Sequence, residues 1–598
     1  MNIKTFDERL KLGNGDYDRL VNSRKPKGID DKKAYIVGTG IAGLSTAGFL
    51  IKDAKMDPSK IVFLEKDDIA GGALDGKLLS DMGYVARGGR ETGHHFEVLW
   101  DLLSVIPSRE DPEMSILDDL YYTNLDDPNF SHCRVTKNQG ERYDNGKFNL
   151  SKDVIKEITR LIMTPDEKLQ DVSVEEVFSD EFLESDFWTF YRTMFAFENW
   201  HSVLELKLYI NRFIHHVAGL PYLSALQFTR YDQYESIVVP MMNWLKDKGV
   251  RTEYNYNVED IDFIITDDKK VATKIIAKDA KTGLDKSIDL TENDMVFITT
   301  GSIVESSAYG TNDQAADINI DEENSFKLWK NLSAKSPEFG KPEVFTSDVD
   351  KTNWESATVT VKSKAIAEYI ENITKRSPYT GNIVTGGIVT ALDSNWLMSW
   401  TINRQGQYIG QPKDEIAVWV YALFTDKEGD YVKKPMKYCT GEEIAKEWLF
   451  HLGVPESEIE SLAKETSTIP VFMPYITAQF MPRSFGDRPY VVPKHAVNFA
   501  FLGQFVETLD DPGRDTVFTT EYSARCAMEA VYVLTGVEKK VPEVFASRYD
   551  IRYLLAGASA LNDGEKPDLD LPMEILVKIA KKLGGTEVEN MLKEHNLV

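Results

Sequence analysis

The stretch AYIVGTGIAGLSTAGFL, residues 34–50, constrains the fold of this chain more than any other. An apolar strand leads into the pattern GxGxxG, and small apolar residues typical of a helix follow. A second apolar run, 61–64, ends at an acid about 20 residues further on. Such glycines allow a tight turn and close approach of a pyrophosphate, while the acid accepts hydrogen bonds from a ribose. The sequence predicts a dinucleotide-binding βαβ unit with the cofactor residues Gly38, Gly40, Ile41, Ala42, Gly43 and Glu65.

Three further segments favour FAD as the dinucleotide. A second glycine cluster, 70–76, follows the ribose acid, as in FAD enzymes of the two-dinucleotide-motif type. The apolar runs 296–301 and 498–503 resemble the middle and closing strands of the same domain. No second strand–GxGxxG–helix unit occurs in the sequence, so we expect no nicotinamide domain. These segments add Asp75, Gly301, Ser302 and Gly503 to the predicted cofactor residues.

Composition excludes several classes of protein. A formal net charge of −27 opposes nucleic acid and generic anionic surfaces, so we expect no nucleic-acid partner. The three cysteines are isolated, which indicates a reducing compartment. The first residues lack an apolar signal, and no apolar run approaches the ~18 residues of a membrane span. We therefore expect a cytoplasmic protein.

The fold class predicted is α/β, with several domains in a chain of 598 residues. Apolar residues at helix spacing in 187–195 and 206–213 predict helices, and the runs 357–361, 381–385 and 417–421 predict strands of a second sheet. The predicted organisation is an arm, 1–32; an FAD-binding Rossmann-like domain, 33–150, 236–310 and 486–545; a helical substrate or lid subdomain, 151–235; a mixed α+β substrate-binding domain, 311–485; and a C-terminal helical region, 546–598.

Residues 574–583 predict a basic amphipathic helix, with isoleucines and leucines on one face and lysines on the other. Such a helix can lie on an anionic bilayer, which predicts peripheral contact with the inner membrane face. The alternative is that it docks on its own protein or on a sister subunit.

The stretch GYVARGGRETGHHFEVLW, 83–100, concentrates charge beside glycine. Gly88 and Gly89 predict a turn that offers N–H groups to an anion, and Glu91 stands where a helix would begin. Beside Arg87 and Arg90, this carboxylate is expected to stay ionised and act as a base. The alternative is a structural acid at a helix start.

A metal site is not expected here. Adjacent histidines such as His94 and His95 point about 100° apart on a helix, and no HExxH or third-ligand pattern follows.

Five motifs together resemble the FAD-dependent fatty acid hydratases, also called myosin-cross-reactive antigens. The resemblance runs from about residue 15 to the C-terminus. The motifs are RGGRE at 87–91, HFE at 95–97, YDQYES at 231–236, TINRQ at 401–405 and DTVFTTEYS at 515–523.

The resemblance implies addition of water across a cis double bond of a free unsaturated fatty acid. It implies that Glu91 polarises the water and that Tyr209 protonates the alkene. FAD is implied to be bound without being consumed, with the reduced form more favourable and the protein a homodimer. The implied carboxylate-binding residues are Gln233, Thr401, Asn403 and Gln407, where some members have histidine at the last position, and the implied flavin neighbours are Arg87, Gly88, Gly89 and Thr516.

This chain departs from some members after the catalytic glutamate. It has Thr92-Gly93 where they have Met-Glu, which can alter water placement or the choice between C10 and C13. Two other functions stay open from the sequence: a flavin oxidoreductase acting on a lipid or an amine, and a noncatalytic lipid-binding protein.

Overall fold

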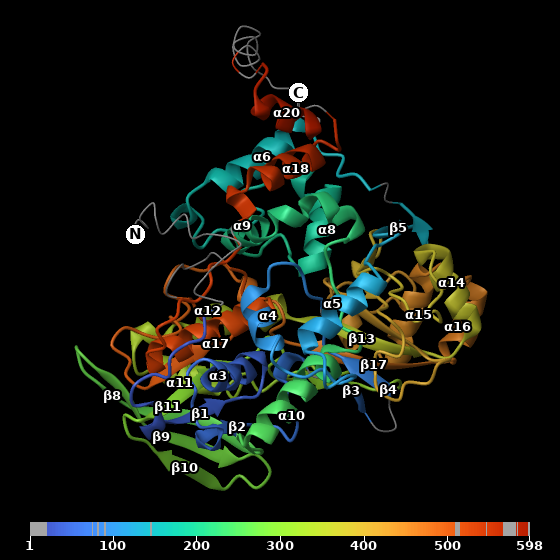
Figure 1. Ribbon diagram of the computed structural model, residues 1–598. Coiled ribbons are helices and arrows are strands. Elements are labelled where there is room, and N and C mark those ends of the chain that lie inside the picture. Colours follow the sequence, from blue (N-terminus) through green and yellow to red (C-terminus); the bar gives the residue numbers. More distant parts are fainter. Residues whose placement is uncertain are drawn as a thin grey trace.

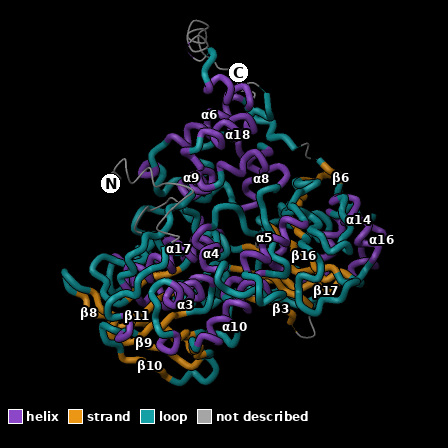
Figure 2. The backbone as a smooth tube through the Cα atoms, viewed as in Figure 1, coloured by secondary structure: helices purple, strands orange, loops and turns teal. Residues whose placement is uncertain are grey.

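A five-stranded sheet, an eight-stranded sheet, two smaller antiparallel sheets and a group of helices make up the described part of the protein (Figure 1). The computed structural model describes residues 21–74, 76–79, 83–88, 91–143, 146–508, 515–545, 547–565, 582 and 584–595, with the backbone alone for 76–79. The strands gather at lower left and at right in the tube view, and a set of helices lies above both (Figure 2). A large cavity is lined by residues from all three parts.

The first sheet is a parallel five-stranded sheet in the order β18-β11-β1-β2-β7. Its central strands are apolar and buried, because helices cover the sheet. Helix α3 (Ile41–Lys52) follows the glycine turn, and α17 (Thr520–Thr535) packs against it. The predicted βαβ unit and the two later strands are confirmed. The strands are β1 (Lys33–Val37), β2 (Ile61–Leu64), β7 (Arg251–Glu253), β11 (Asp294–Thr299) and β18 (Phe499–Leu502).

An antiparallel meander and one helix complete this region. Strands β8 (Tyr256–Ile265), β9 (Lys270–Asp279) and β10 (Asp285–Asp289) form the meander. Helix α10 (Val239–Lys248) continues a π-helical turn, Tyr234–Val238, which follows the predicted carboxylate-binding residue Gln233.

The second sheet has eight strands in the order β12-β17-β13-β16-β15-β14-β5-β6. Every residue of β13 (Trp354–Val361) and β16 (Ile416–Ala422) is buried, since helices pack on one face and the hairpin β3–β4 lies near the other. The remaining strands are β3 (Gly76–Leu79), β4 (Gly83–Ala86), β5 (Val135–Lys137), β6 (Glu141–Arg142), β12 (Ala308–Tyr309), β14 (Val389–Ala391), β15 (Met398–Thr401) and β17 (Thr466–Met473).

The structure confirms the strand predictions at 357–361 and 417–421, but the one at 381–385 is wrong. Gly381, Gly386 and Gly387 have φ of 80°, 70° and 133°, which turn the chain away from an extended path. Strand β5 also adds to this second sheet by pairing with β14, although it lies in the range 33–150.

The helices above the sheets confirm the predictions at 187–195 and 206–213 (Figure 1). Residues 574–583 lie outside the described residues except for Lys582. Within the described ranges, no helix has the length and apolar character needed to cross a bilayer. The helices are α4 (Glu97–Leu103), α5 (Ile116–Asp126), α6 (Lys152–Met163), α7 (Asp180–Leu183), α8 (Asp186–Phe195), α9 (Val203–Arg212), α11 (Lys327–Ser333), α12 (Pro342–Thr346), α13 (Val349–Thr352), α14 (Lys364–Thr374), α15 (Gly441–His451), α16 (Glu456–Ala463), α18 (Ile551–Leu561) and α20 (Glu587–Glu594).

Helix α15 carries a buried charge pair that predicts a pH dependence of stability. The Glu447 carboxylate accepts the backbone N–H groups of 430, 431 and 432, and it lies 3.3 Å from His451 Nε2. Burial alone would lower the pKa of His451, but hydrogen bonds to Asp430 and Glu447 outweigh it and raise the pKa to about 9.

The raised pKa means that the folded protein binds this proton more tightly than the unfolded chain. The stabilisation, on the order of 3 kcal/mol, is complete below pH ~6.5 and is lost as the pH rises to about 9. Thermal midpoints of the wild type and His451→Gln, measured from pH 6 to 9.5, should converge as the pH rises. A constant difference across that range would contradict this assignment.

Candidate functional site

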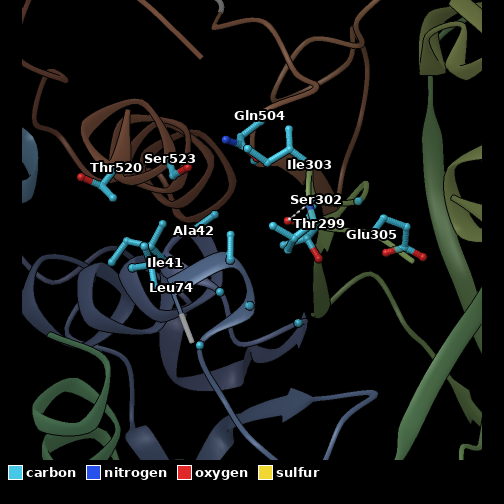
Figure 3. A pocket seen from close by; sticks show the side chains of 18 of the residues that line it. Ile41, Ala42, Leu74, Thr299, Ser302, Ile303, Glu305, Gln504, Thr520 and Ser523 are labelled. Atoms are coloured by element: carbon cyan, nitrogen blue, oxygen red, sulfur yellow. Dashed lines mark hydrogen bonds between the residues drawn. The ribbon is translucent and has the colours of Figure 1, made fainter. Parts of the chain in front are cut away.

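A cavity of about 930 Å³ opens at the carboxyl edge of the parallel sheet. Its lining includes Gly38, Gly40, Ile41 and Ala42 from the first turn, together with Glu65 after β2. Ile41 and Ala42 at the start of α3 lie across from Thr520 and Ser523 of α17 (Figure 3). The predicted nucleotide residues are therefore brought together around one space.

The glycines of the first turn are required by close contacts. A Cβ on Gly38, whose φ is +89°, would stand 2.7 Å from Thr299 Oγ1. A Cβ on Gly43 would stand 2.2 Å from the Gly38 carbonyl oxygen. Gly43 thus lies behind the cavity wall and lets α3 approach β1, as the motif requires.

Glu65 is buried beside the same turn. Its carboxylate accepts hydrogen bonds from the Thr39 backbone N–H at 2.8 Å, from the Thr39 hydroxyl, and from the Asp67 N–H. Burial raises the pKa of Glu65, and these hydrogen bonds act against that rise. The carboxylate is fixed where a ribose hydroxyl would meet it.

The cavity lining also carries polar atoms that a ligand can satisfy. The hydroxyls of Thr300 and Thr520 are buried and have no hydrogen-bond partner among the described residues. Gly301 and Gly503, with φ of +137° and +104°, bring backbone to the cavity beside them. Buried polar atoms of this kind are costly unless water or a ligand binds them, so the site fits a polar dinucleotide.

The other predicted cofactor residues do not all line the large cavity. Ser302 and Arg87 line the large cavity, and the Arg87 guanidinium donates to the Gly72 carbonyl at 2.6 Å. Gly88 lines a second, smaller cavity instead. Thr516 is not among the described residues that line either cavity. Asp75 and Gly89 lie outside the described residues.

The large cavity also has an apolar part, which is lined mainly by residues of the helical region and is called the apolar arm below. Glu91 and Gly93 lie on its wall, and the segment that holds them is fixed by paired backbone hydrogen bonds between Thr92 and Gln227, at 2.8 and 2.9 Å. The Glu91 carboxylate thus shares the cavity lining with a group of apolar side chains, which suits a polar reaction on an apolar chain. The apolar lining is Met194, Phe195, Phe213, Val217, Leu220 and Leu226.

The prediction that Glu91 stands at a helix start is wrong. Helix α4 begins at Glu97, and His95 with φ of 66° turns the chain before it. The N–H groups of Val98 and Leu99 donate to the Glu521 carboxylate of α17 at 3.2 and 2.8 Å. Glu521 therefore occupies the helix N-terminus, and Glu91 is left in an extended segment facing the cavity.

Tyr209 lies one side chain behind the cavity wall. Its ring packs on Phe195 at 5.1 Å and on Phe213 at 6.3 Å, and both of those residues line the cavity. Burial raises the pKa of Tyr209 well above 10, with the Glu205 carboxylate adding to the rise. The phenol is therefore protonated at neutral pH, and its role as a proton donor stays a prediction.

The four predicted carboxylate-binding residues line one small cavity of about 60 Å³. Gln233 lines this cavity and the large one, so it stands where the two meet. Side-chain oxygens of Gln233 and Asn403 are buried and lack hydrogen-bond partners within the ranges described. The four residues, distant in sequence, are Gln233, Thr401, Asn403 and Gln407.

Several lining residues were missed by the sequence analysis. Arg230 and Arg404 add positive charge to the small cavity, although each also pairs with an aspartate, Asp119 and Asp127. Tyr191 and His216 line the apolar arm. The motif YDQYES begins one residue after Arg230, and TINRQ contains Arg404, so the sequence motifs could have pointed to both arginines. No local pattern marks Tyr191 or His216.

The fold and the site define a Rossmann-like protein of the dinucleotide-binding class with an attached apolar channel. A family model described as the MCRA family matches residues 31–532. An oleate hydratase from Streptococcus pyogenes serotype M49 (strain NZ131) is 47% identical over 591 residues, 98% of this chain and 99% of that protein. A linoleate hydratase from Lactiplantibacillus plantarum is 31% identical over 541 residues, 84% of this chain and 94% of that protein. The chain belongs to the MCRA family.

A search of solved structures finds cyclohexylamine oxidase from Brevibacterium oxydans IH-35A. The alignment has a TM-score of 0.47 and 11% identity, and it covers 84% of this chain and 99% of that one.

Proposed function

We propose that this protein is a fatty acid hydratase that binds FAD and adds water across a cis double bond of a free unsaturated fatty acid. The observation that carries the proposal is one continuous space with a nucleotide end, a carboxylate on an apolar arm, and polar residues at a junction with a second cavity. The two hydratase relatives support the reaction class.

The nucleotide end of the large cavity fits FAD. The turn 38–42 and Glu65 would hold the pyrophosphate and the ribose of FAD, and Gly301, Ser302 and Gly503 would lie near its ring system. When bound, FAD would supply a fixed planar ring system that shapes the site rather than electrons, because addition of water is redox-neutral.

In the proposed reaction, protein side chains carry out the proton transfers. An alkene is a very weak base, so its protonation needs a donor in contact and negative charge close to the developing cation. In our proposal the Tyr209 hydroxyl gives its proton to one alkene carbon, and water forms a C–O bond to the other. Glu91 takes the proton that the water loses, and solvent returns it to the tyrosinate, which balances the reaction.

The small cavity would hold the fatty acid carboxylate. Gln233 and Asn403 offer amide donors, Thr401 offers a hydroxyl, and Arg230 and Arg404 provide positive charge nearby. Hydrogen bonds from neutral donors to a charged group are worth about 1.5–3 kcal/mol each. Such an anchor fixes the distance from the carboxylate to the reacting bond, and so the position that is hydrated.

The proposal is tested by turnover of oleate and linoleate with the flavin spectrum and peroxide followed together. We expect a hydroxy fatty acid to accumulate over many turnovers while the flavin spectrum returns to its starting state and no peroxide forms. Stoichiometric flavin reduction or peroxide release would identify a lipid oxidoreductase instead. Tight binding without product would identify a lipid-binding protein.

Asn403→Leu is expected to raise KM for the free acid by about 10–100-fold, because one hydrogen bond to the carboxylate is lost. The kcat should change less, since the reacting bond lies away from the anchor. The methyl ester of the same fatty acid is the control, because it lacks the charge that Asn403 would bind. Equal effects on the acid and the ester would show that Asn403 does not bind the carboxylate.

Gly43→Ala is expected to abolish or strongly weaken flavin binding, because its methyl group would collide with the Gly38 carbonyl 2.2 Å away. Gly48→Ala is the matched control in the same helix, since its methyl group would meet only the flexible end of Leu102. The ratio of flavin to protein absorbance after purification measures both. Full flavin content in Gly43→Ala would contradict the cofactor site.

The proposal also includes the localisation, oligomeric state, membrane contact and flavin redox state expected from the sequence. We propose a cytoplasmic homodimer that contacts anionic membrane through 574–583 and is more active with reduced flavin. Light scattering tests the dimer, and co-sedimentation with anionic and neutral vesicles tests the membrane contact. Loss of vesicle binding when the lysines of 574–583 are replaced would support it; binding that is indifferent to lipid charge would oppose it.

A further inference from the structure

His216 is a residue of the cavity lining whose Nε2 lies close to Gly93, two residues after Glu91. It lies in the 3-10 segment Ile214–Tyr222 that follows α9, and it lines the large cavity with Glu91 and Gly93. Nε2 is shielded from solvent and has no hydrogen-bond partner in the part of the chain that the structure describes. It stands 3.6 Å from the position that a Cβ on Gly93 would occupy.

The surroundings keep this imidazole neutral. Burial lowers the pKa of His216 to about 3, and His94, Arg212 and His95 add to the effect. Arg212 is itself fixed by Asp515 at 3.0 Å and by the His95 carbonyl at 2.7 Å. A neutral ring can exchange hydrogen bonds with water without competing with Glu91 for its proton.

The ring is also held in place. Phe213 stacks on His216 with ring centroids 5.9 Å apart, and His215 lies against it at 3.8 Å. An unpartnered nitrogen on a fixed ring, in a residue that shares the cavity lining with a carboxylate, is a candidate position for one small polar molecule.

We propose that His216 Nε2 holds the reacting water together with Glu91, in the space that Gly93 leaves open. This inference rests on the proposed hydration. One water O–H bond breaks as the oxygen bonds to carbon, and its proton passes to Glu91. The other O–H bond stays intact and donates to His216, so the imidazole keeps its protonation state. His216 fixes the direction from which the oxygen approaches the alkene.

This geometry gives a physical reason why Gly93, where some family members have glutamate, can affect the placement of water. A side chain at position 93 would project toward His216 Nε2 and fill the water position. Because Gly93 lacks the positive φ that strains other residues, alanine is tolerated by the backbone there. Gly93→Ala therefore displaces the water without altering the histidine.

The test compares His216→Leu, His216→Gln and Gly93→Ala with His215→Leu. His215 is a matched control, because both of its ring nitrogens lack partners among the described residues, it is not in the described lining of the cavity, and leucine keeps an apolar side chain packed against His216. We expect kcat of His216→Leu and Gly93→Ala to fall about 10–100-fold with KM within about threefold of wild type. Glutamine should recover much of the loss, since its amide can bind water, and His215→Leu should keep kcat within about threefold.

The outcomes separate this inference from the proposed function. Absence of hydroxy acid from the wild type would refute the hydration itself. A wild type that hydrates, with His216→Leu within about threefold in kcat or with His215→Leu impaired equally, would refute the role of His216. If His216→Leu loses its flavin, Gly93→Ala decides, and an unchanged kcat in that variant overturns the inference.

Discussion

Glu91→Gln is expected to lower kcat for hydration by about 10³-fold or more and to leave KM within about threefold. Glutamine keeps the size and hydrogen-bonding atoms of the side chain but removes the charge and the proton acceptor. The loss therefore falls on the transition state, where water gives up a proton and positive charge develops on carbon. In the proposed arrangement, substrate binding depends on the carboxylate anchor and on the apolar arm, so it should survive.

Glu97→Gln is the matched control for Glu91. Glu97 lies six positions further along, pairs with His95 at 2.8 Å, and is not in the described lining of the cavity. Flavin content and thermal midpoint should be normal in Glu91→Gln. A Glu91→Gln protein that keeps its flavin and retains more than about a tenth of wild-type kcat would remove Glu91 from the chemistry.

Tyr209→Phe is expected to lower kcat by about 10²–10³-fold, because the alkene would lose its proton donor. Burial raises the pKa of Tyr209 well above 10, so the donor is present across the neutral range. For contact with substrate, a shift at Phe195 or Phe213 must open the wall in front of the ring. The phenylalanine variant removes only an oxygen and should fold normally.

Tyr191→Phe provides the comparison that decides which phenol acts. Tyr191 lines the cavity directly, and its hydroxyl is buried with no hydrogen-bond partner in the described ranges. Burial also raises its pKa well above 10. We expect Tyr191→Phe to keep kcat within about fivefold of wild type. The reverse pattern, with Tyr191→Phe inactive and Tyr209→Phe active, would transfer the donor role to Tyr191.

Local sequence patterns predicted those parts of the fold that depend on local contacts. The strands 33–37 and 61–64 and the helix from Ile41 follow from apolar runs and from glycines whose Cβ atoms would collide with backbone or side chains. The order of the eight-stranded sheet depends on pairing between distant segments, which no local pattern encodes. The strand prediction at 381–385 was wrong because apolar residues there suit a strand, whereas glycines in and beside the run turn the chain.

For the candidate site too, local patterns predicted some residues, while others depend on contacts between distant segments. The residues of the first glycine turn form one short motif, so the sequence predicted them, whereas Gln233 and Asn403 meet only through folding and were named by resemblance. Glu91 lines the cavity, and its catalytic role stays a prediction. The sequence did not predict that Glu521, far along the chain, takes the helix N-terminus. No role was assigned to His216 from the sequence, because the cavity beside it has no sequence signal.

Mass spectrometry of the product formed from oleate in water enriched in ¹⁸O tests the central claim most directly. If a protein carboxylate activates solvent for addition to the double bond, each hydroxy fatty acid contains one labelled oxygen at the new hydroxyl. The label should appear at the same level with and without dissolved oxygen. An unlabelled hydroxyl, or a product that forms only when oxygen gas is present, would contradict the account.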